Sequence, residues 1–542
     1  MAIVASPSGS RLQPEKVKAL LTKAGLSQSE ALIDDWCVLL GSFEDSIQDV
    51  LKQEDDLPRP NLAKYPRSEI QIPKDATESD KGGWATICIA KSIEPVNSLL
   101  DKKKVALKDN IALAGIRCLN GMNPLGREWV PGCDATVATR IMDAGATIVG
   151  KATCENACME PSSDTSWTGI VHNPYADYYA CGGSSSGSGR VVATGSADMA
   201  LGCDQGGSVR IPAAFCGLVG LKPTWGLVPY TGILGLHAEI DHCGPMSRTV
   251  RDNALLLEAI AGPDGLDDRQ PRSMPTEALQ YSNQLDRFMR ISEAHLKPLS
   301  GFKIGVLKEG FDLPMLDSNV EKAVRSAVAD LAALGAEVID VSIPEHHQIC
   351  VSWTCTQALA GGRDGLLGQR TGRKELYMTD ITGGPGCVSQ ERFDAWGPGA
   401  QNLYMKYLYV VENHGATVNA KASNLIRKQT RAYDAILSSL DALVMPTIPF
   451  PATPSFREGE QHGPLERLVR MAGTILNTAP FNATGHPALS VPVGFVPALD
   501  NQSIKLPAAL QIVGKAFDEM SCFKIAACWE RIKDWKSIIV ES

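Results

Sequence analysis

Apolar and polar positions follow a helical period in the first part of the chain. Residues 11–53 place apolar side chains three and four positions apart, with acidic residues on the opposite face, which predicts amphipathic helices. Four prolines then interrupt the period within 55–73, a pattern typical of a linker or wrap. We therefore expect a helical N-terminal extension with its linker over residues 1–75, ahead of a catalytic domain over 76–542.

From about residue 84 helical and strand periods alternate. The segment 134–152 has a helical apolar face, then Gly145, then a short apolar strand. The same order returns in 319–344, a helix followed by Gly335 and a strand. Two proline-ended apolar runs at 440–451 and 486–495 predict further core strands. This alternation predicts an α/β fold of layered helices and strands. Residues 360–415 have little period and predict a loop or lid region.

Composition narrows the class of protein. Of the 542 residues, 44% are apolar and 21% are charged, as in ordinary globular proteins, and the net charge of −9 argues against a general affinity for nucleic acid. We found no run of 18 apolar residues, so no membrane span is predicted. Fifteen cysteines, an odd count without a secretory signal, predict reduced thiols and a cytoplasmic location.

Metal ligands are poorly supported by the sequence. His346 and His347 form the single histidine pair and lack an HExxH context. Cys154 and Cys158 lie four positions apart without a second ligand pair, which favours packing over metal binding. We expect no cofactor and no metal.

Two Gly/Ser knots stand out, Gly182-Gly183-Ser184-Ser185-Ser186-Gly187 and Gly206-Gly207-Ser208. Three interpretations of the first knot are open. It matches G-x-S-x-G, in which Ser185 would be the nucleophile of an α/β-hydrolase elbow, but the polar, turn-like segment before it is not the required strand. It could instead hold phosphate through backbone N–H groups, or it could be a structural turn without chemistry.

The second knot offers clearer chemistry. Its glycines permit unusual backbone turns, and a short helix is expected to follow, so Ser208 would lie beside free backbone N–H groups. Those groups could stabilise an oxyanion while the serine attacks a carbonyl, although a simple anion site would use the same geometry. No histidine lies in 182–208 to serve as the base.

Several segments together resemble the amidase signature family of Ser-Ser-Lys amide hydrolases. The resemblance covers nearly the whole chain after the N-terminal extension, and the closest likeness is to bacterial amidases of nitrile degradation. It rests on VALKDN, the two knots, SVRIPAAFCGLVGLKPTWGLVP, DHCGPMSRTVRD and NTAPFNATGHPALSVP, in the family order. It implies a central mixed β-sheet with helices on both faces.

The resemblance also implies residue roles. Ser208 would be the nucleophile, Ser184 the bridging serine after a cis peptide bond, and Lys108 the base, which must be neutral and is expected to have a pKa lowered by burial. Without the resemblance, Lys108 would be interpreted as a surface lysine. The oxyanion hole would use the N–H groups of Gln205, Gly206, Gly207 and Ser208. Supporting roles would fall to Ser185, Asp204 and Arg210, with a surface ion pair as the alternative for Arg210.

The expected activity is hydrolysis of a small carboxamide, of the acylamide amidohydrolase type, through an acyl-enzyme on Ser208. An acyltransferase or esterase using the same residues, and a non-catalytic binding protein, are the alternatives. A homodimer through the N-terminal helices is the expected assembly, with packing of these helices on their own core as the alternative. Pocket residues are expected within 360–415, within 154–167, and near Ile448 and Phe481. Three departures from the family pattern, at Ser186, Cys203 and Ala508-Ala509, leave the pocket shape open.

Overall fold

The computed structural model describes residues 9–126, 128–293, 295–381, 388–457, 459–460 and 462–540, and the chain divides into two compact units, Met1–Pro58 and Arg59–Ser542. The smaller unit consists of two helices, α1 (Pro14–Lys23) and α2 (Glu30–Leu51), which confirms the helical prediction for this part of the chain. Val17, Ile33 and Cys37 form the buried core between them.

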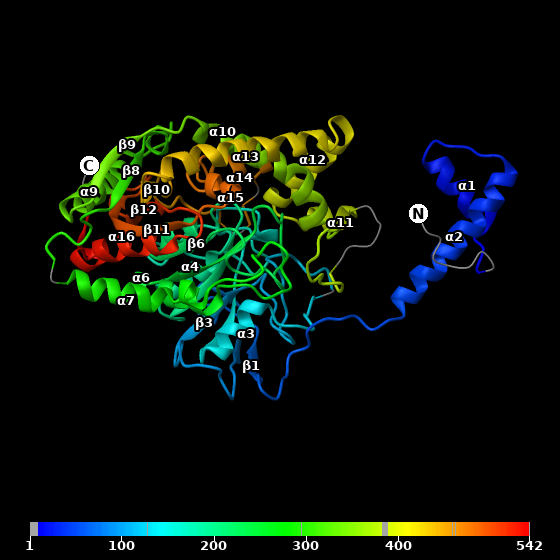
Figure 1. Cartoon of the computed structure of the whole chain (residues 1–542), viewed down its shortest axis with the longest axis horizontal. Helices are drawn as coiled ribbons and strands as arrows, with labels where there is room; N and C mark the ends of the chain where they lie inside the picture. The colour runs from blue at the N-terminus through cyan, green and yellow to red at the C-terminus, as the bar shows by residue number, and fades with distance from the viewer. Residues whose placement is uncertain are drawn as a thin grey trace. The chain divides into compact units, whose positions relative to one another are not determined.

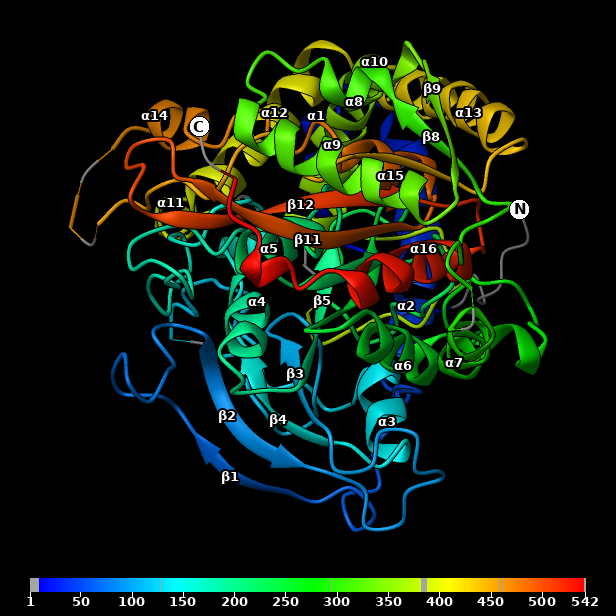
Figure 2. The same ribbon diagram turned by 90° about the vertical axis from the view of Figure 1, so that its left-hand side faces the viewer.

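The larger unit is built on one sheet, whose strand order is β1-β2-β4-β3-β5-β7-β6-β11-β12-β10-β8-β9. The sheet is mixed, because β3 runs parallel to β4 and β5, whereas β7, β6, β11 and β12 pair antiparallel in succession. Figure 2 shows the strands following one twisted surface from β1 to β12. The strands are β1 (Arg67–Gln71), β2 (Trp84–Ala90), β3 (Lys104–Lys108), β4 (Thr147–Ala152), β5 (Met199–Asp204), β6 (Val219–Lys222), β7 (His242–Ser247), β8 (Lys303–Leu307), β9 (Glu337–Val341), β10 (Ala442–Pro446), β11 (Ala488–Pro497) and β12 (Lys505–Val513).

Helices cover both faces of this sheet, as Figure 1 shows. The α-helices are α3 (Thr136–Asp143), α4 (Ser186–Ala193), α5 (Arg210–Cys216), α6 (Val250–Ile260), α7 (Tyr281–Ser292), α8 (Lys308–Phe311), α9 (Ser318–Ala333), α10 (Glu345–Thr356), α11 (Gln390–Asp394), α12 (Pro398–Asn413), α13 (Thr417–Leu437), α14 (Pro464–Val469), α15 (Ala479–Thr484) and α16 (Glu519–Ile532). Shorter or irregular turns of helix are η1 (Asn156–Cys158), η2 (Thr276–Leu279), the π-helical η3 (Gln357–Leu366) and η4 (Trp535–Ser537). Among the described residues, no helix is both long and apolar enough to cross a bilayer.

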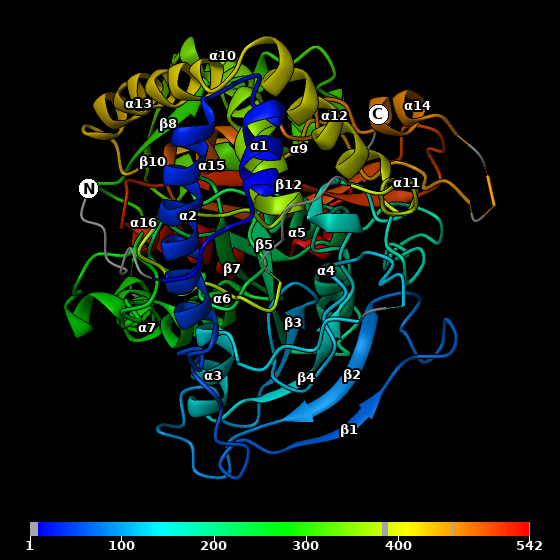
Figure 3. The same cartoon turned by 90° about the vertical axis from the view of Figure 1, so that its right-hand side faces the viewer.

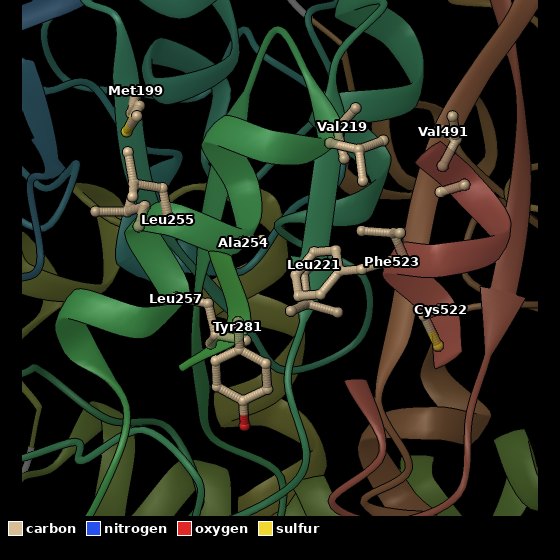
Figure 4. Close-up of a cluster of buried hydrophobic side chains, with 14 of the residues drawn as sticks. Met199, Val219, Leu221, Ala254, Leu255, Leu257, Tyr281, Val491, Cys522 and Phe523 are labelled. Atoms are coloured by element: carbon tan, nitrogen blue, oxygen red, sulfur yellow. The ribbon is translucent and has the colours of Figure 1, made fainter. Parts of the chain in front are cut away.

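Alternation along the strands sorts side chains into different cores. In β3, Val105 and Leu107 join the largest core under α3, α6, α7, α9 and α16, whereas Ala106 joins the core under α4 and α5. Figure 4 shows part of the largest core, where Leu221 of β6 lies beside Phe523, whose ring meets that of Tyr281 edge to face at a centroid distance of 6.3 Å. Lys108 continues the strand on the side of Ala106, toward α4.

Most predicted elements are confirmed and two predictions need correction. Helix, glycine and strand follow one another in 134–152 and 319–344, with Gly145 and Gly335 at φ of 91° and 102°. The smaller unit ends at Pro58, not residue 75, because β1 pairs antiparallel with β2 and belongs to the sheet. Much of 360–415 is helical, with α12 packed against η3, and Figure 3 shows α12 extending toward α14. Residues 382–387 of that predicted lid lie outside the described part.

Candidate active site

The first knot is a tight loop that leads into α4. The Gly183–Ser184 peptide bond is cis, as the resemblance implied. A Cβ on Gly183 would overlap the carbonyl oxygens of Glu160 and Ser162, so the loop can approach this closely only with glycine. No described strand leads into the knot, so the context that an α/β-hydrolase elbow requires is missing.

Lys108 meets this knot from the end of β3. Its Nζ donates a hydrogen bond of 2.7 Å to Ser184 Oγ and a longer one of 3.4 Å to the carbonyl of Cys203. The lysine and Ser184 are both fully buried. Lys108 is therefore not a surface lysine, and a buried amine bonded to a serine hydroxyl can exchange a proton with it.

The electrostatics of Lys108 differ from the sequence expectation. Burial disfavours the ammonium and lowers the pKa of Lys108, but charge on the sulfurs of Cys158, Cys203 and Cys154 raises it, and the balance lies above the ordinary lysine value. The reciprocal effect lowers the pKa of Cys158 to about 7, against burial, through hydrogen bonds with Cys154 and the charge of Lys108. Sequence reasoning named these three cysteines but did not place them beside Lys108, because only the fold brings their segments to the end of β3.

A buried ion pair between Asp204 and Arg210 flanks the second knot and stabilises it. Asp204, the last residue of β5, accepts hydrogen bonds of 3.0 Å from both Nε and Nη2 of Arg210. Both side chains are fully buried, so Arg210 is not a surface ion-pair residue. The remaining guanidinium donors bind Thr478, Gln511 and Asn482. Burial alone would raise the pKa of Asp204, but Arg210 and Asn482 hold it well below its usual range.

This ion pair fixes the backbone around Ser208. The N–H groups of Gly207 and Val209 donate to the Asp204 carboxylate at 2.7 and 3.1 Å. The N–H of Gly207 is therefore engaged, which corrects its predicted place in the oxyanion hole. Within the described part of the chain, the N–H groups of Gln205, Gly206 and Ser208 donate no hydrogen bond.

Ser208 lies in the loop between β5 and α5, and it is partly exposed. No hydrogen bond joins its hydroxyl to Ser184 in the part of the chain that the structure describes. Ser185 Oγ donates to the carbonyl of Cys203, to which Lys108 also donates, and accepts from the N–H of Cys203, both at 3.3 Å. It fastens α4 to β5 and does not contact Ser208 through a hydrogen bond.

The departures from the family pattern have local partners. Ser186 donates a 2.7 Å hydrogen bond to the buried Glu155, and Cys203 Sγ lies 3.3 Å from Asn110 Oδ1. Ala508 and Ala509 lie buried in β12 beside β11.

A cavity of about 530 Å³ is lined in part by Gln205, which directly precedes the second knot. Gln205 Nε2 donates to Tyr230 Oη at 2.8 Å, and Trp353 Nε1 donates to the Gln205 carbonyl at 2.9 Å. Parts of 360–415 and Ala157-Cys158 line it as predicted, but Ile448 and Phe481 belong to hydrophobic cores instead. Sequence reasoning missed Tyr230 and Trp353, although Tyr230 directly follows the segment SVRIPAAFCGLVGLKPTWGLVP that supported the resemblance.

One cluster of carboxylates could suggest a metal. Asp267, Asp268 and Glu375 come together, but Arg373 pairs with all three, at 3.4 Å from Asp267 and 2.7 Å from Glu375 and in direct contact with Asp268. The guanidinium supplies the positive charge that these carboxylates need.

Comparison with known proteins agrees with this geometry. The family model described as Amidase matches residues 98–523. An enantioselective amidase of Rhodococcus rhodochrous is 38% identical over 439 residues, which is 79% of each chain. A glutamyl-tRNA(Gln) amidotransferase subunit of Synechococcus sp. (strain CC9902) is 33% identical over 482 residues, 88% of this chain and 90% of the relative. The native peptide amidase of Stenotrophomonas maltophilia has a TM-score of 0.63 at 25% identity, covering 85% of this chain and 86% of that one. The chain belongs to the amidase signature family, whose members include amide hydrolases.

Proposed function

We propose that this protein hydrolyses a carboxylic acid amide to the acid and ammonia or an amine, through an acyl-enzyme on Ser208. The observation that carries the proposal is the buried hydrogen bond of 2.7 Å between Lys108 Nζ and Ser184 Oγ. The cis Gly183–Ser184 bond and the bracing of the loop by Asp204 and Arg210 support it.

In the first half of the reaction, Ser208 Oγ attacks the carbonyl carbon. Its proton passes to Ser184, and the Ser184 proton passes to neutral Lys108. The unengaged N–H groups of Gln205, Gly206 and Ser208 are the donors available for the oxyanion. The proton then returns through Ser184 to the leaving nitrogen as the C–N bond breaks. Water cleaves the ester by the reverse relay and restores Ser208.

The supply of neutral Lys108 depends on Cys158. A thiolate with an ammonium holds the same number of protons as a thiol with a neutral amine, so one internal proton shift gives the basic form of Lys108. The lowered pKa of Cys158, about 7, and the raised pKa of Lys108 favour the thiolate–ammonium pair, so forming neutral Lys108 costs free energy and the Cys158 thiolate opposes it.

Acyl transfer is the second candidate function. It is favoured by the 33% identity to a protein named as part of an amidotransferase. An acyl-enzyme is common to both reactions, and the nucleophile that arrives next decides the product. From the resemblance to bacterial amidases of nitrile degradation we propose a homodimer formed through α1 and α2, and from the cysteine content a cytoplasmic location.

The test is the fate of the acyl group from a panel of amides. Ammonia release that is lost in Ser208→Ala supports hydrolysis. Added hydroxylamine should divert product from acid to hydroxamate without changing ammonia release where deacylation is not limiting. Ammonia release that survives in Ser208→Ala would exclude the proposed nucleophile.

A further inference from the structure

A chain of contacts between polar side chains of the cavity lining begins at Gln205, the residue before the second knot. Gln205 bonds to the hydroxyl of Tyr230 at 2.8 Å, and the guanidinium of Arg269 lies over the Tyr230 ring, 5.1 Å from its centroid. Arg269 in turn donates a 2.7 Å hydrogen bond to the carbonyl of Asp241. All four residues line the cavity, so Asp241 lies along its wall, separated from the nucleophile loop by Tyr230 and Arg269.

Asp241 carries an acceptor that the protein does not use. Its Oδ1 accepts the N–H of Leu236 at 3.0 Å, but its buried Oδ2 accepts no hydrogen bond from the described residues. Only 2% of the residue is exposed. Its neighbour Asp267 makes the contrast clear, because Arg269 and the N–H of Tyr230 bind both of its oxygens at 2.6 to 3.1 Å. A buried carboxylate oxygen without a donor is costly, and because Asp241 belongs to the cavity lining, a ligand in the cavity can supply the missing donor.

The charge around Asp241 indicates what kind of donor fits. The guanidinium of Arg370 lies 3.6 Å from Oδ2, too far for a hydrogen bond but close enough to compensate the charge. With Arg269 also adjacent, a cationic group would meet two guanidiniums, so a neutral N–H or O–H is favoured. Gln205 Oε1 and Thr231 Oγ1, also buried in the cavity lining, likewise have no hydrogen-bond partner among the described residues.

Most of the remaining lining is apolar. It includes Met122, Trp129, Leu236, Leu366, Met378 and Trp396. A volume of about 530 Å³ exceeds what the amide of a short aliphatic acid would fill and lies in the range of drug-sized ligands.

We propose that Asp241 determines specificity by accepting a hydrogen bond from a neutral N–H or O–H group on the acyl part of a large, mostly apolar carboxamide. This inference rests on the proposed amide hydrolysis, because it names the substrate class for the same site. The donor lies away from the scissile carbonyl, since Tyr230 and Arg269 separate Asp241 from the knot.

Binding to the inactive Ser208→Ala protein, measured by calorimetry, tests this without turnover. The O–H arm compares 3-(4-hydroxyphenyl)propanamide with its methyl ether. The N–H arm compares the 4-acetamidophenyl analogue with its N-methyl derivative. In at least one arm the compound with the free O–H or N–H should bind about 10-fold or more tightly than its methylated analogue. The added change Asp241→Asn should reduce this affinity ratio to near one. The control Asp364→Asn changes another carboxylate of the cavity lining, which pairs with Arg363, and should keep the ratio.

Equal binding within both pairs would overturn the proposal, and so would a ratio that survives Asp241→Asn. Tightest binding by the cationic 4-(aminomethyl)phenyl analogue would also overturn it. The affinity ratio within each pair is measured first in Ser208→Ala, where Asp241 is unchanged. The proposal can therefore be contradicted even if the Asp241→Asn protein does not fold. Ammonia release by the unmodified protein is recorded separately. If ammonia is released but the compounds with a free O–H or N–H bind no more tightly, only the proposed role of Asp241 is contradicted. If those compounds bind more tightly but no amide releases ammonia, only the proposed hydrolysis is contradicted.

Discussion

Arg210→Gln tests how far the second knot depends on one buried guanidinium. The change removes both hydrogen bonds of 3.0 Å to Asp204 and the bonds to Thr478, Gln511 and Asn482. Asp204 would remain a buried carboxylate without its cation, and removing one partner of such a pair costs about 3–5 kcal/mol. We expect the free energy of unfolding, from urea titration at pH 7, to fall by that amount.

The matched control is Arg251→Gln. Arg251 makes the same two-point contact with Asp286, at 2.8 Å for each bond, but its side chain is 55% exposed. Exposed pairs contribute about 0–1 kcal/mol, so this change should leave the urea midpoint nearly unmoved. Equal losses in the two variants would refute the reasoning that burial makes the Arg210 pair important.

The same change should also reduce catalysis. Asp204 positions the N–H groups of Gly207 and Val209, and without Arg210 it will take up a proton more readily and hold them less firmly. A displacement of about 1 Å at the nucleophile can cost on the order of 100-fold in kcat. Unchanged kcat in folded Arg210→Gln would contradict the bracing role, and Arg251→Gln should keep full activity.

Three further predictions concern pH and domain structure. Because Lys108 must be neutral to act as the base, kcat/KM should rise toward alkaline pH. Cys158→Ala removes a charge that raises the pKa of Lys108, so this rise should move to lower pH. An unchanged pH–rate profile would contradict the coupling between Cys158 and Lys108. Burial raises the pKa of Glu160 to about 7, so the free energy of unfolding should fall as the pH rises from about 4.5, the pKa of the unfolded carboxyl, to 7. Glu160→Gln can still accept the N–H of Gly399, and it should remove up to about 3 kcal/mol of this pH dependence, measured by urea titrations at pH 5 and 8. The separately expressed segment 59–542 has its own cores, so it should fold and keep its activity, and an unfolded 59–542 would contradict the division at Pro58. Comparing its mass in solution with that of the full chain shows whether α1 and α2 form a dimer.

Local periodicity predicted those elements whose burial is repeated along the sequence. The helix and strand around Gly145 and those around Gly335 are examples, because each carries a full apolar face. β1 was missed, since four of its five residues are exposed and prolines flank it. Arg67–Gln71 is a strand because it pairs with β2, and such pairing cannot be recognised from the periodicity of the sequence.

The site was predictable where family motifs carry it and not where it depends on the packing around those motifs. Family motifs identified Lys108 and Ser184, which the fold brings from 76 positions apart to 2.7 Å. The thiols around Lys108 and the acceptor on Asp241 carry no sequence signal, because their chemistry depends on burial and on which donors reach them. Gly207 shows the same limit, since the motif does not reveal that its N–H is already bound to Asp204.

The most direct test of the account is to find which serine reacts. The folded protein is treated with a small fluorophosphonate, and the modified peptide is identified by mass spectrometry. We predict attachment at Ser208, lost in Lys108→Met and Ser184→Ala but kept in Ser185→Ala. Attachment at Ser185, or undiminished labelling of Ser208 in Lys108→Met, would contradict the serine–serine–lysine relay.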